Sequence, residues 1–147
     1  MNYFIYSDIE LEDKYDEEIR KLCEFPDGLS FFFEQVGGYD DFAEVSQVSR
    51  LLNIDLELFQ KIDFPDNPDT HETWQSLEFI IAKLTEFKQA ILQNPRYFEQ
   101  VLHGGDLHPP DYGYLSQDRI SKDIEELEKN LKRLQAKGSK KIRFFYM

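Results

Sequence analysis

Two long stretches of apolar residues, spaced three and four positions apart, set the strongest limit on how this chain can fold. Residues at this spacing lie on one face of an α-helix, so each stretch predicts an amphipathic helix. We expect the first helix to run from Thr70 to about Gln93, and the second to follow Ser116 as its N-cap. The two helices are expected to pack antiparallel. Their apolar positions are Trp74, Leu77, Ile81, Leu84, Phe87 and Ile91, and Ile120, Ile124, Leu127, Leu131 and Leu134.

Short runs of aromatic and β-branched residues near the two ends predict β-strands at residues 3–6 and 141–146. A lone strand leaves its backbone groups unpaired, so we expect these two strands to pair with each other or with one further short strand. The sequence therefore predicts a mainly α fold. It is a compact helical domain with a long antiparallel helix pair and a small β-sheet formed by the N- and C-terminal strands.

Shorter helices are expected between these elements. Asp40 or Asp41 is a candidate N-cap for one of them, and Asp55 for another. Residues 30–36 suit either a helix or a buried strand, and a helix is the preferred interpretation. Asn94 and the proline after it predict a further short helix that ends near Leu102. The expected segments are a first one from Asp13 or Tyr15 to Glu24, which ends at the turn 25–28, and residues 30–36, 40–52, 55–62 and 94–102.

The length of 147 residues is typical of one domain, so residues 1–147 are expected to form a single unit. No apolar run approaches the roughly 18 residues of a spanning helix, and the first eight residues lack the basic region of a signal peptide. We therefore expect a cytoplasmic protein. The single cysteine, Cys23, falls on an apolar stripe with Ile19 and Leu22, which indicates a buried, inert thiol.

The negative charge of the chain is unevenly distributed. Residues 1–69, the acidic half, hold 18 Asp and Glu against 5 Lys and Arg, whereas residues 70–147, the amphipathic helical half, hold 11 against 12. A field of this sign repels nucleic acids and anionic membranes, and it favours a basic protein partner. Solubility alone is the alternative explanation of the acidity.

Aromatic residues accompany the carboxylates of the acidic half, and we do not expect all of them to be buried. Carboxylates can steer the association of a basic partner while exposed rings anchor it. The alternative is that most of these rings complete the core. The carboxylates expected at the partner-binding surface are Glu10, Glu12, Asp13, Asp16, Glu17, Asp40, Asp41 and Glu44. The rings are Tyr3, Tyr6, Tyr15, Phe25, Phe31, Phe32, Phe33, Tyr39, Phe42, Phe59 and Phe64.

Residues 105–109, Gly-Asp-Leu-His-Pro, resemble the catalytic loop of aminoglycoside phosphotransferases and related kinase-like enzymes, which reads His-Gly-Asp-Leu-His-Pro-Gly-Asn. The resemblance would make Asp106 the catalytic base. Those enzymes also need a nucleotide-binding lobe with a strand lysine before the loop and a metal-binding Asp after it. The long amphipathic helices on both sides of the loop leave no room for either part, so the sequence does not predict a kinase.

The same loop supports an alternative function, a metal-dependent enzyme centred on His103, Asp106 and His108. Imidazole and carboxylate ligands suit zinc, manganese or iron, and three protein ligands would leave one coordination position open. Turn and helix-end roles explain the same three residues without a metal. No other cofactor is expected.

No catalytic motif outweighs the charge pattern, so the leading hypothesis is a non-catalytic module that binds a basic protein. In general type the chain is similar to the small acidic immunity proteins and antitoxins with which bacteria neutralise basic nuclease toxins. A third hypothesis is a structural subunit of a helical assembly, because the apolar stripe from Ile120 to Leu134 could face another chain.

Overall fold

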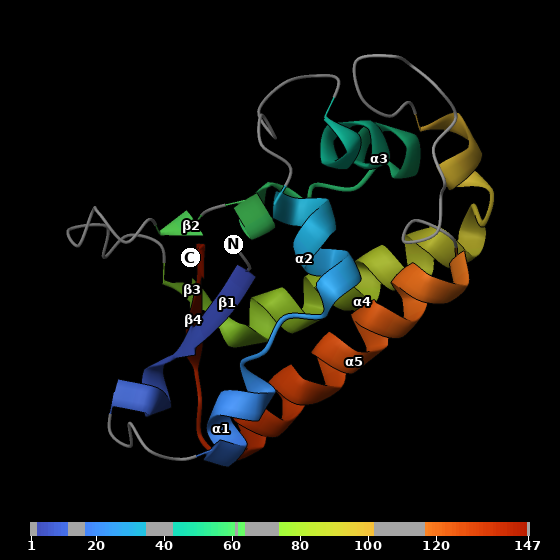
Figure 1. Cartoon of the computed structure of the whole chain (residues 1–147). Helices are drawn as coiled ribbons and strands as arrows, with labels where there is room; N and C mark the ends of the chain where they lie inside the picture. Colours follow the sequence, from blue (N-terminus) through green and yellow to red (C-terminus); the bar gives the residue numbers. More distant parts are fainter. Residues whose placement is uncertain are drawn as a thin grey trace.

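The computed structural model describes residues 3–11, 17–34, 43–60, 62–63, 74–101 and 117–146. Its centre is a pair of long helices, α4 (Leu77–Gln93) and α5 (Gln117–Ala136), which run antiparallel as predicted (Figure 1). The backbone N–H of Leu77, where α4 starts, donates to the carbonyl of Lys140, four residues beyond the end of α5, at 2.9 Å. This bond ties the beginning of one helix to the end of the other.

The apolar stripes of both helices form the middle of the core. Two shorter helices, α1 (Glu17–Leu22) and α2 (Asp27–Glu34), pack against α5. Helix α3 (Glu44–Leu52) contacts α2 and the short 3-10 helix η4 (Tyr97–Gln100). The stripe residues at 0% or 1% exposure are Leu77, Leu84, Phe87, Ile91, Ile120, Ile124, Leu127, Leu131 and Leu134.

A small sheet forms around the C-terminal strand β4 (Lys141–Tyr146). All of strand β1 (Tyr3–Ser7) pairs antiparallel with β4, from Tyr3 opposite Tyr146 to Ser7 opposite Ile142. On its other side, β2 (Ile62–Asp63) pairs parallel and β3 (Gln75–Ser76) pairs antiparallel. The predicted pairing of the two terminal strands is thus confirmed, and β4 has two short neighbours in addition.

One face of the sheet is buried by aromatic rings. Tyr3 and Phe144 point inward from β1 and β4, where the ring of Phe144 lies 5.8 Å from that of Phe59. Phe59 belongs to the 3-10 helix η2 (Glu57–Gln60) and stacks on Phe33 of α2 at 4.8 Å. The hydroxyl of Tyr3 donates to the carbonyl oxygens of Phe33 and Phe59, at 3.3 and 3.2 Å. This ring cluster joins the sheet to α2 and η2.

The carboxylate of Asp8 closes the other end of the sheet. Asp8 begins the 3-10 helix η1 (Asp8–Leu11) directly after β1. Its two oxygens accept from the backbone N–H groups of Lys140 and Lys141 and from the hydroxyl of Ser139, at 2.8 to 3.2 Å. The end of β1 is thereby fastened to the beginning of β4, which lies more than 130 residues later.

Helix α4 begins later than the sequence predicted. It starts at Leu77, not near Thr70, with Ser76 as its N-cap; the Ser76 hydroxyl accepts from the N–H of Phe79 at 3.3 Å. Gln75 and Ser76 form β3 and pair with β4, so the helix begins only after them. Trp74 fitted the helical spacing by chance, since it precedes the strand. The end of the helix at Gln93 is as expected.

The first half contains the expected helices with shifted ends. The preferred helix at residues 30–36 is α2, which already begins at Asp27, inside the predicted turn. Neither Asp40 nor Asp41 caps α3, since its N-cap position is Ala43. Asp55 does cap η2 by accepting from the N–H of Glu57 at 2.9 Å, although Ile62 lies in a strand. Cys23 is buried as expected.

Candidate protein-binding surfaces

The structure describes the side chains of only two of the eight carboxylates predicted to bind a partner. Glu17 is exposed in the first turn of α1. Glu44 is 2% exposed, so its carboxylate does not belong to the surface. It lies on the same side of α3 as Val45 and Val48, both of which enter the core. The others, whose side chains lie outside the described part of the chain, are Glu10, Glu12, Asp13, Asp16, Asp40 and Asp41.

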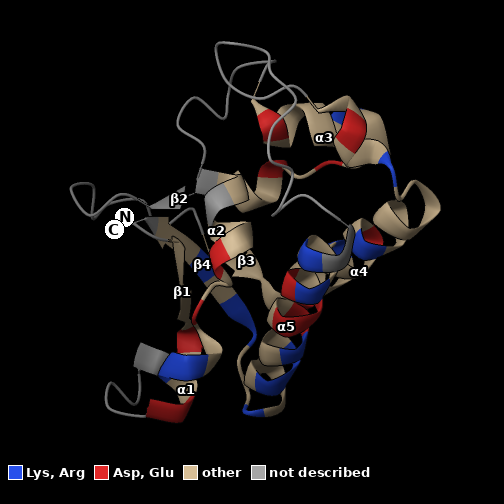
Figure 2. Ribbon diagram, turned by 45° about the vertical axis from the view of Figure 1, so that its right-hand side comes forward, with Lys and Arg blue, Asp and Glu red and all other residues tan. Residues whose placement is uncertain are grey.

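Further exposed carboxylates lie close to Glu17 in the chain. Glu18, Glu24 and Asp27 are exposed along α1 and at the start of α2, and Figure 2 shows the acidic colour on α1. Only Glu18 among them has a basic partner among the described residues, since its carboxylate lies 3.3 Å from the Nζ of Lys137. Arg20 and Lys21 are also exposed on α1, so residues 17–27 hold four carboxylates against two cations and are only weakly negative.

Most described rings of the acidic half turn out to be core residues. The expectation that these rings anchor a partner is therefore wrong for them, because a ring at 7% exposure or less cannot contact another protein. Within the described residues of that set, Tyr6 is the exception at 39% exposure. The buried rings are Tyr3, Phe25, Phe32, Phe33 and Phe59, whereas the side chains of Tyr15, Phe31, Tyr39, Phe42 and Phe64 lie outside the described part.

The face of the sheet that points away from the core is unusually aromatic. Side chains alternate along a strand, so the neighbours of the buried residues of β1 and β4 point outward. A sheet face in contact with water normally carries polar side chains. We call this surface the outer face of the sheet. It comprises Phe4, Tyr6, Trp74, Arg143 and Phe145, all of them exposed or half-buried.

The residues of the outer face are stacked on one another. The guanidinium of Arg143 lies 4.8 Å from the ring centre of Tyr6 and 5.2 Å from that of Trp74. Phe145 stacks on Tyr6 at 4.1 Å and on Phe4 at 5.2 Å. Cation–π contacts and ring stacking hold these side chains in fixed positions. The outer face is thus a preorganised surface with little side-chain freedom left to lose on binding.

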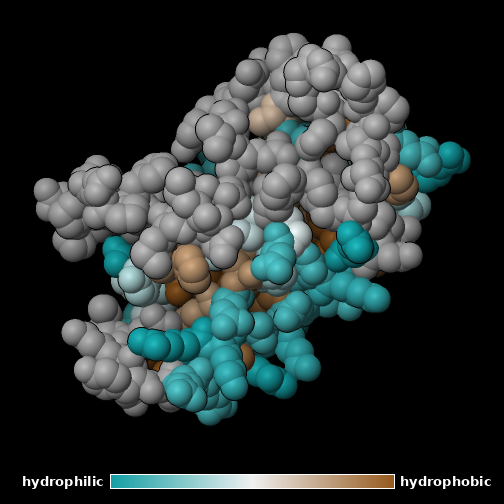
Figure 3. All heavy atoms as spheres, viewed as in Figure 1, coloured by the Kyte–Doolittle hydropathy of each residue, from teal (hydrophilic) through white to brown (hydrophobic). Residues whose placement is uncertain are grey.

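The apolar stripe that suggested a helical assembly is not exposed. Its five residues on α5, from Ile120 to Leu134, are all buried in the core of this chain. The outward surface over α5 is hydrophilic, as the teal atoms of Figure 3 show. The stripe is therefore explained by the fold of one chain, and it no longer supports an assembly of several.

The predicted metal site lies outside the described residues, which end at Val101 and resume at Gln117. His103, Asp106 and His108 thus stay a prediction. Elsewhere in the described part, no group of three or more His, Cys, Asp or Glu side chains could hold a metal ion. No helix among the described residues has the length and apolar character needed to cross a membrane.

A second charged region was missed by the sequence analysis. Residues 129–147 contain seven Lys and Arg and no Asp or Glu. Dividing the chain at residue 69 hid this cluster, because the acidic residues between 70 and 128 cancel it. A separate count over the last turns of the predicted helix would have found it. In the structure these cations follow the second half of α5 and continue into β4, where Figure 2 shows them in blue.

No protein-family model matches the sequence, and no curated protein or solved structure is significantly similar to it.

Proposed function

We propose that this protein is a non-catalytic binding module that recognises a basic protein through the outer face of its sheet. The observation that carries the proposal is the stack formed by Tyr6, Trp74 and Arg143. Tryptophan, tyrosine and arginine are the residue types that contribute most to protein–protein affinity. A sheet face that carries all three in fixed positions has the composition of an interface centre.

The charge of the sequence next to η1 and β2 supports a basic partner. Segments 12–16 and 64–73 continue directly from η1 and β2, and together they hold six Asp and Glu and one Lys. Long-range attraction by such carboxylates accelerates encounter with a cationic protein, while the rings supply buried contact area. A basic toxin neutralised by this chain, as in the immunity and antitoxin class, is the first partner type to test.

The proposal is tested by capturing proteins from a lysate of the source organism on the immobilised chain, followed by affinity measurements with the captured protein. The double variant Tyr6→Ala with Trp74→Ala should bind about 30-fold more weakly, because removing interface-centre side chains costs about 2 kcal/mol or more. The matched control is Phe79→Ala with Leu92→Ala, which removes two exposed apolar side chains from α4, 56% and 49% exposed. This control should bind like the unmodified chain.

Charge is tested separately with Asp13→Lys combined with Asp16→Lys, two carboxylates of segment 12–16. The expected result is slower association that depends less on salt, with an unchanged melting temperature. Two results would contradict the proposed function. The captured protein could be acidic, or the Tyr6 and Trp74 variant could bind it as tightly as the control variant does.

A further inference from the structure

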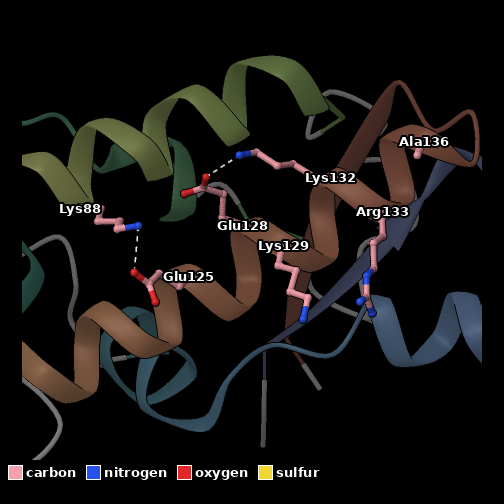
Figure 4. A pocket seen from close by; sticks show the side chains of 7 residues that line it. All are labelled: Lys88, Glu125, Glu128, Lys129, Lys132, Arg133 and Ala136. Atoms are coloured by element: carbon pink, nitrogen blue, oxygen red, sulfur yellow. Dashed lines mark hydrogen bonds and ion pairs between the residues drawn. The ribbon is translucent and has the colours of Figure 1, made fainter.

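An open groove runs between α4 and α5 on the surface of the molecule. It has a volume of about 420 Å³, and its lining carries four cationic side chains and two carboxylates (Figure 4). Lys88 comes from α4, and the rest of the lining comes from α5. The residues are Lys88, Glu125, Glu128, Lys129, Lys132, Arg133 and Ala136.

Two of the cations are neutralised within the groove. The Nζ of Lys88 lies 2.9 Å from a carboxylate oxygen of Glu125, and the hydrogen bond between them raises the pKa of Lys88. The Nζ of Lys132 lies 2.7 Å from a carboxylate oxygen of Glu128. Each of these two lysines thus has a carboxylate partner inside the groove.

Lys129 and Arg133 have no carboxylate partner among the residues that the structure describes. Both are exposed, and neither forms an ion pair with any residue in the described part of the chain. They are four positions apart on α5, so they lie one turn apart on the same face. In Figure 4 their charged ends extend in the same direction, away from α4. The segment that follows them supplies no acid, since residues 129–147 contain neither Asp nor Glu.

We propose that this groove docks an acidic helix of a partner protein, with two carboxylates of that helix, four residues apart, on Lys129 and Arg133. A helix laid along this surface of α5 can pack on it by interdigitation of side-chain ridges. The spacing of the two cations equals one helical turn, so carboxylates at positions i and i+4 of a docked helix match them. Ala136 and the aliphatic stems of the lysines give such a helix apolar contact.

The lining favours a protein over a nucleic acid. A phosphate backbone is negative along its whole length, so it would meet Glu125 and Glu128 as well as the cations. A protein helix can place carboxylates only where the cations are. The net charge of −12 also opposes the approach of a long polyanion. The groove shares no residue with the outer face of the sheet, so this inference stands independently of the proposed function.

The test uses fluorescein-labelled alanine-rich helical peptides and fluorescence anisotropy at about 50 mM NaCl. One peptide carries glutamates in i, i+4 pairs on one face. The other has the same composition, with the glutamates distributed around the helix. The paired peptide should bind, and the distributed peptide should bind about tenfold more weakly.

The decisive variant is Lys129→Glu with Arg133→Glu, and it should weaken binding of the paired peptide about tenfold. The matched control is Arg119→Glu with Lys122→Glu, which reverses two exposed cations of the same helix outside the groove and changes the net charge equally. Its affinity should change less than about twofold. Circular dichroism verifies that both variants retain their helices.

Three results would overturn the inference. Equal losses in the two variants would mean that only net charge matters. Equal binding of the two peptides would remove the one-turn match. Tighter binding of a single-stranded oligonucleotide than of the paired peptide would assign the groove to nucleic acid.

Discussion

Replacing Phe144 with alanine removes a ring from the junction between the sheet and the helices. Phe144 is 0% exposed, and its ring centre lies 5.8 Å from Phe59, 5.9 Å from Phe25 and 6.4 Å from Tyr3. Burying an aromatic side chain removes about 150 Å² or more from water, which at ~25 cal/mol per Å² contributes roughly 4 kcal/mol. The neighbouring rings are themselves held in place, so the cavity cannot close. We expect a loss of about 4–5 kcal/mol in the free energy of unfolding.

The adjacent residue supplies a matched control on the same strand. Phe145 lies on the outer face, half-buried, where its contacts are the stacks with Tyr6 and Phe4. Phe145→Ala should lower the free energy of unfolding by only about 1–2 kcal/mol, because its half-buried ring contributes stacking contacts but leaves no closed cavity when it is removed. In a chain of this length the corresponding falls in melting temperature are about 10 °C or more for Phe144→Ala and about 3–6 °C for Phe145→Ala.

Urea unfolding followed by circular dichroism measures both free energies, and the fluorescence of Trp74, the single tryptophan, reports independently on the sheet. Equal losses of stability in Phe145→Ala and Phe144→Ala would contradict the different burial of the two rings. A loss of less than about 2 kcal/mol in Phe144→Ala would place its ring outside the core.

Two further substitutions test the polar contacts. Asp8→Ala should lower the free energy of unfolding by about 2 kcal/mol, because the carboxylate accepts hydrogen bonds from the backbone of residues 140 and 141. Asp8→Asn should lower it less, and urea unfolding compares the two variants. Burial, with a smaller contribution from Glu126, raises the pKa of Asp123 above 3.8, so its ionisation destabilises the folded state as the pH rises through that value and beyond. Asp123→Asn should therefore be more stable than the unmodified chain at pH 7 and lose this advantage near pH 3.8; a stability difference independent of pH would contradict it.

The sequence was sufficient for the main architecture but not for its short strands. The terminal strands were predictable because aromatic and β-branched runs are distinctive and a lone strand needs a partner. Strands β2 and β3 have two residues each, too few to show any periodicity. Their pairing depends on β4, more than 60 residues later in the chain, and local patterns contain no information about such contacts.

The candidate surfaces were only partly predictable for similar reasons. Counting rings in the acidic half could not separate Tyr3 from Tyr6, since burial depends on which face of β1 each one occupies. The alternation along the strand contained that information once the strand itself was identified. Glu44 was misplaced because counting carboxylates ignored its spacing, one and four positions before Val45 and Val48, which puts it on the buried side of α3.

The central position of β4 has a consequence for how the protein is made. Each of β1, β2 and β3 pairs with β4, and Tyr3 meets its partner Tyr146 only across almost the entire chain. While the ribosome is still synthesising the preceding residues, the three earlier strands have no sheet to join, although α4 can already form locally. Such non-local pairing slows folding, because a very long loop must close first. Until residues 141–146 emerge from the ribosome, the rings of Tyr3 and Phe59 cannot pack on Phe144. The nascent chain therefore exposes apolar surface that a chaperone would need to shield.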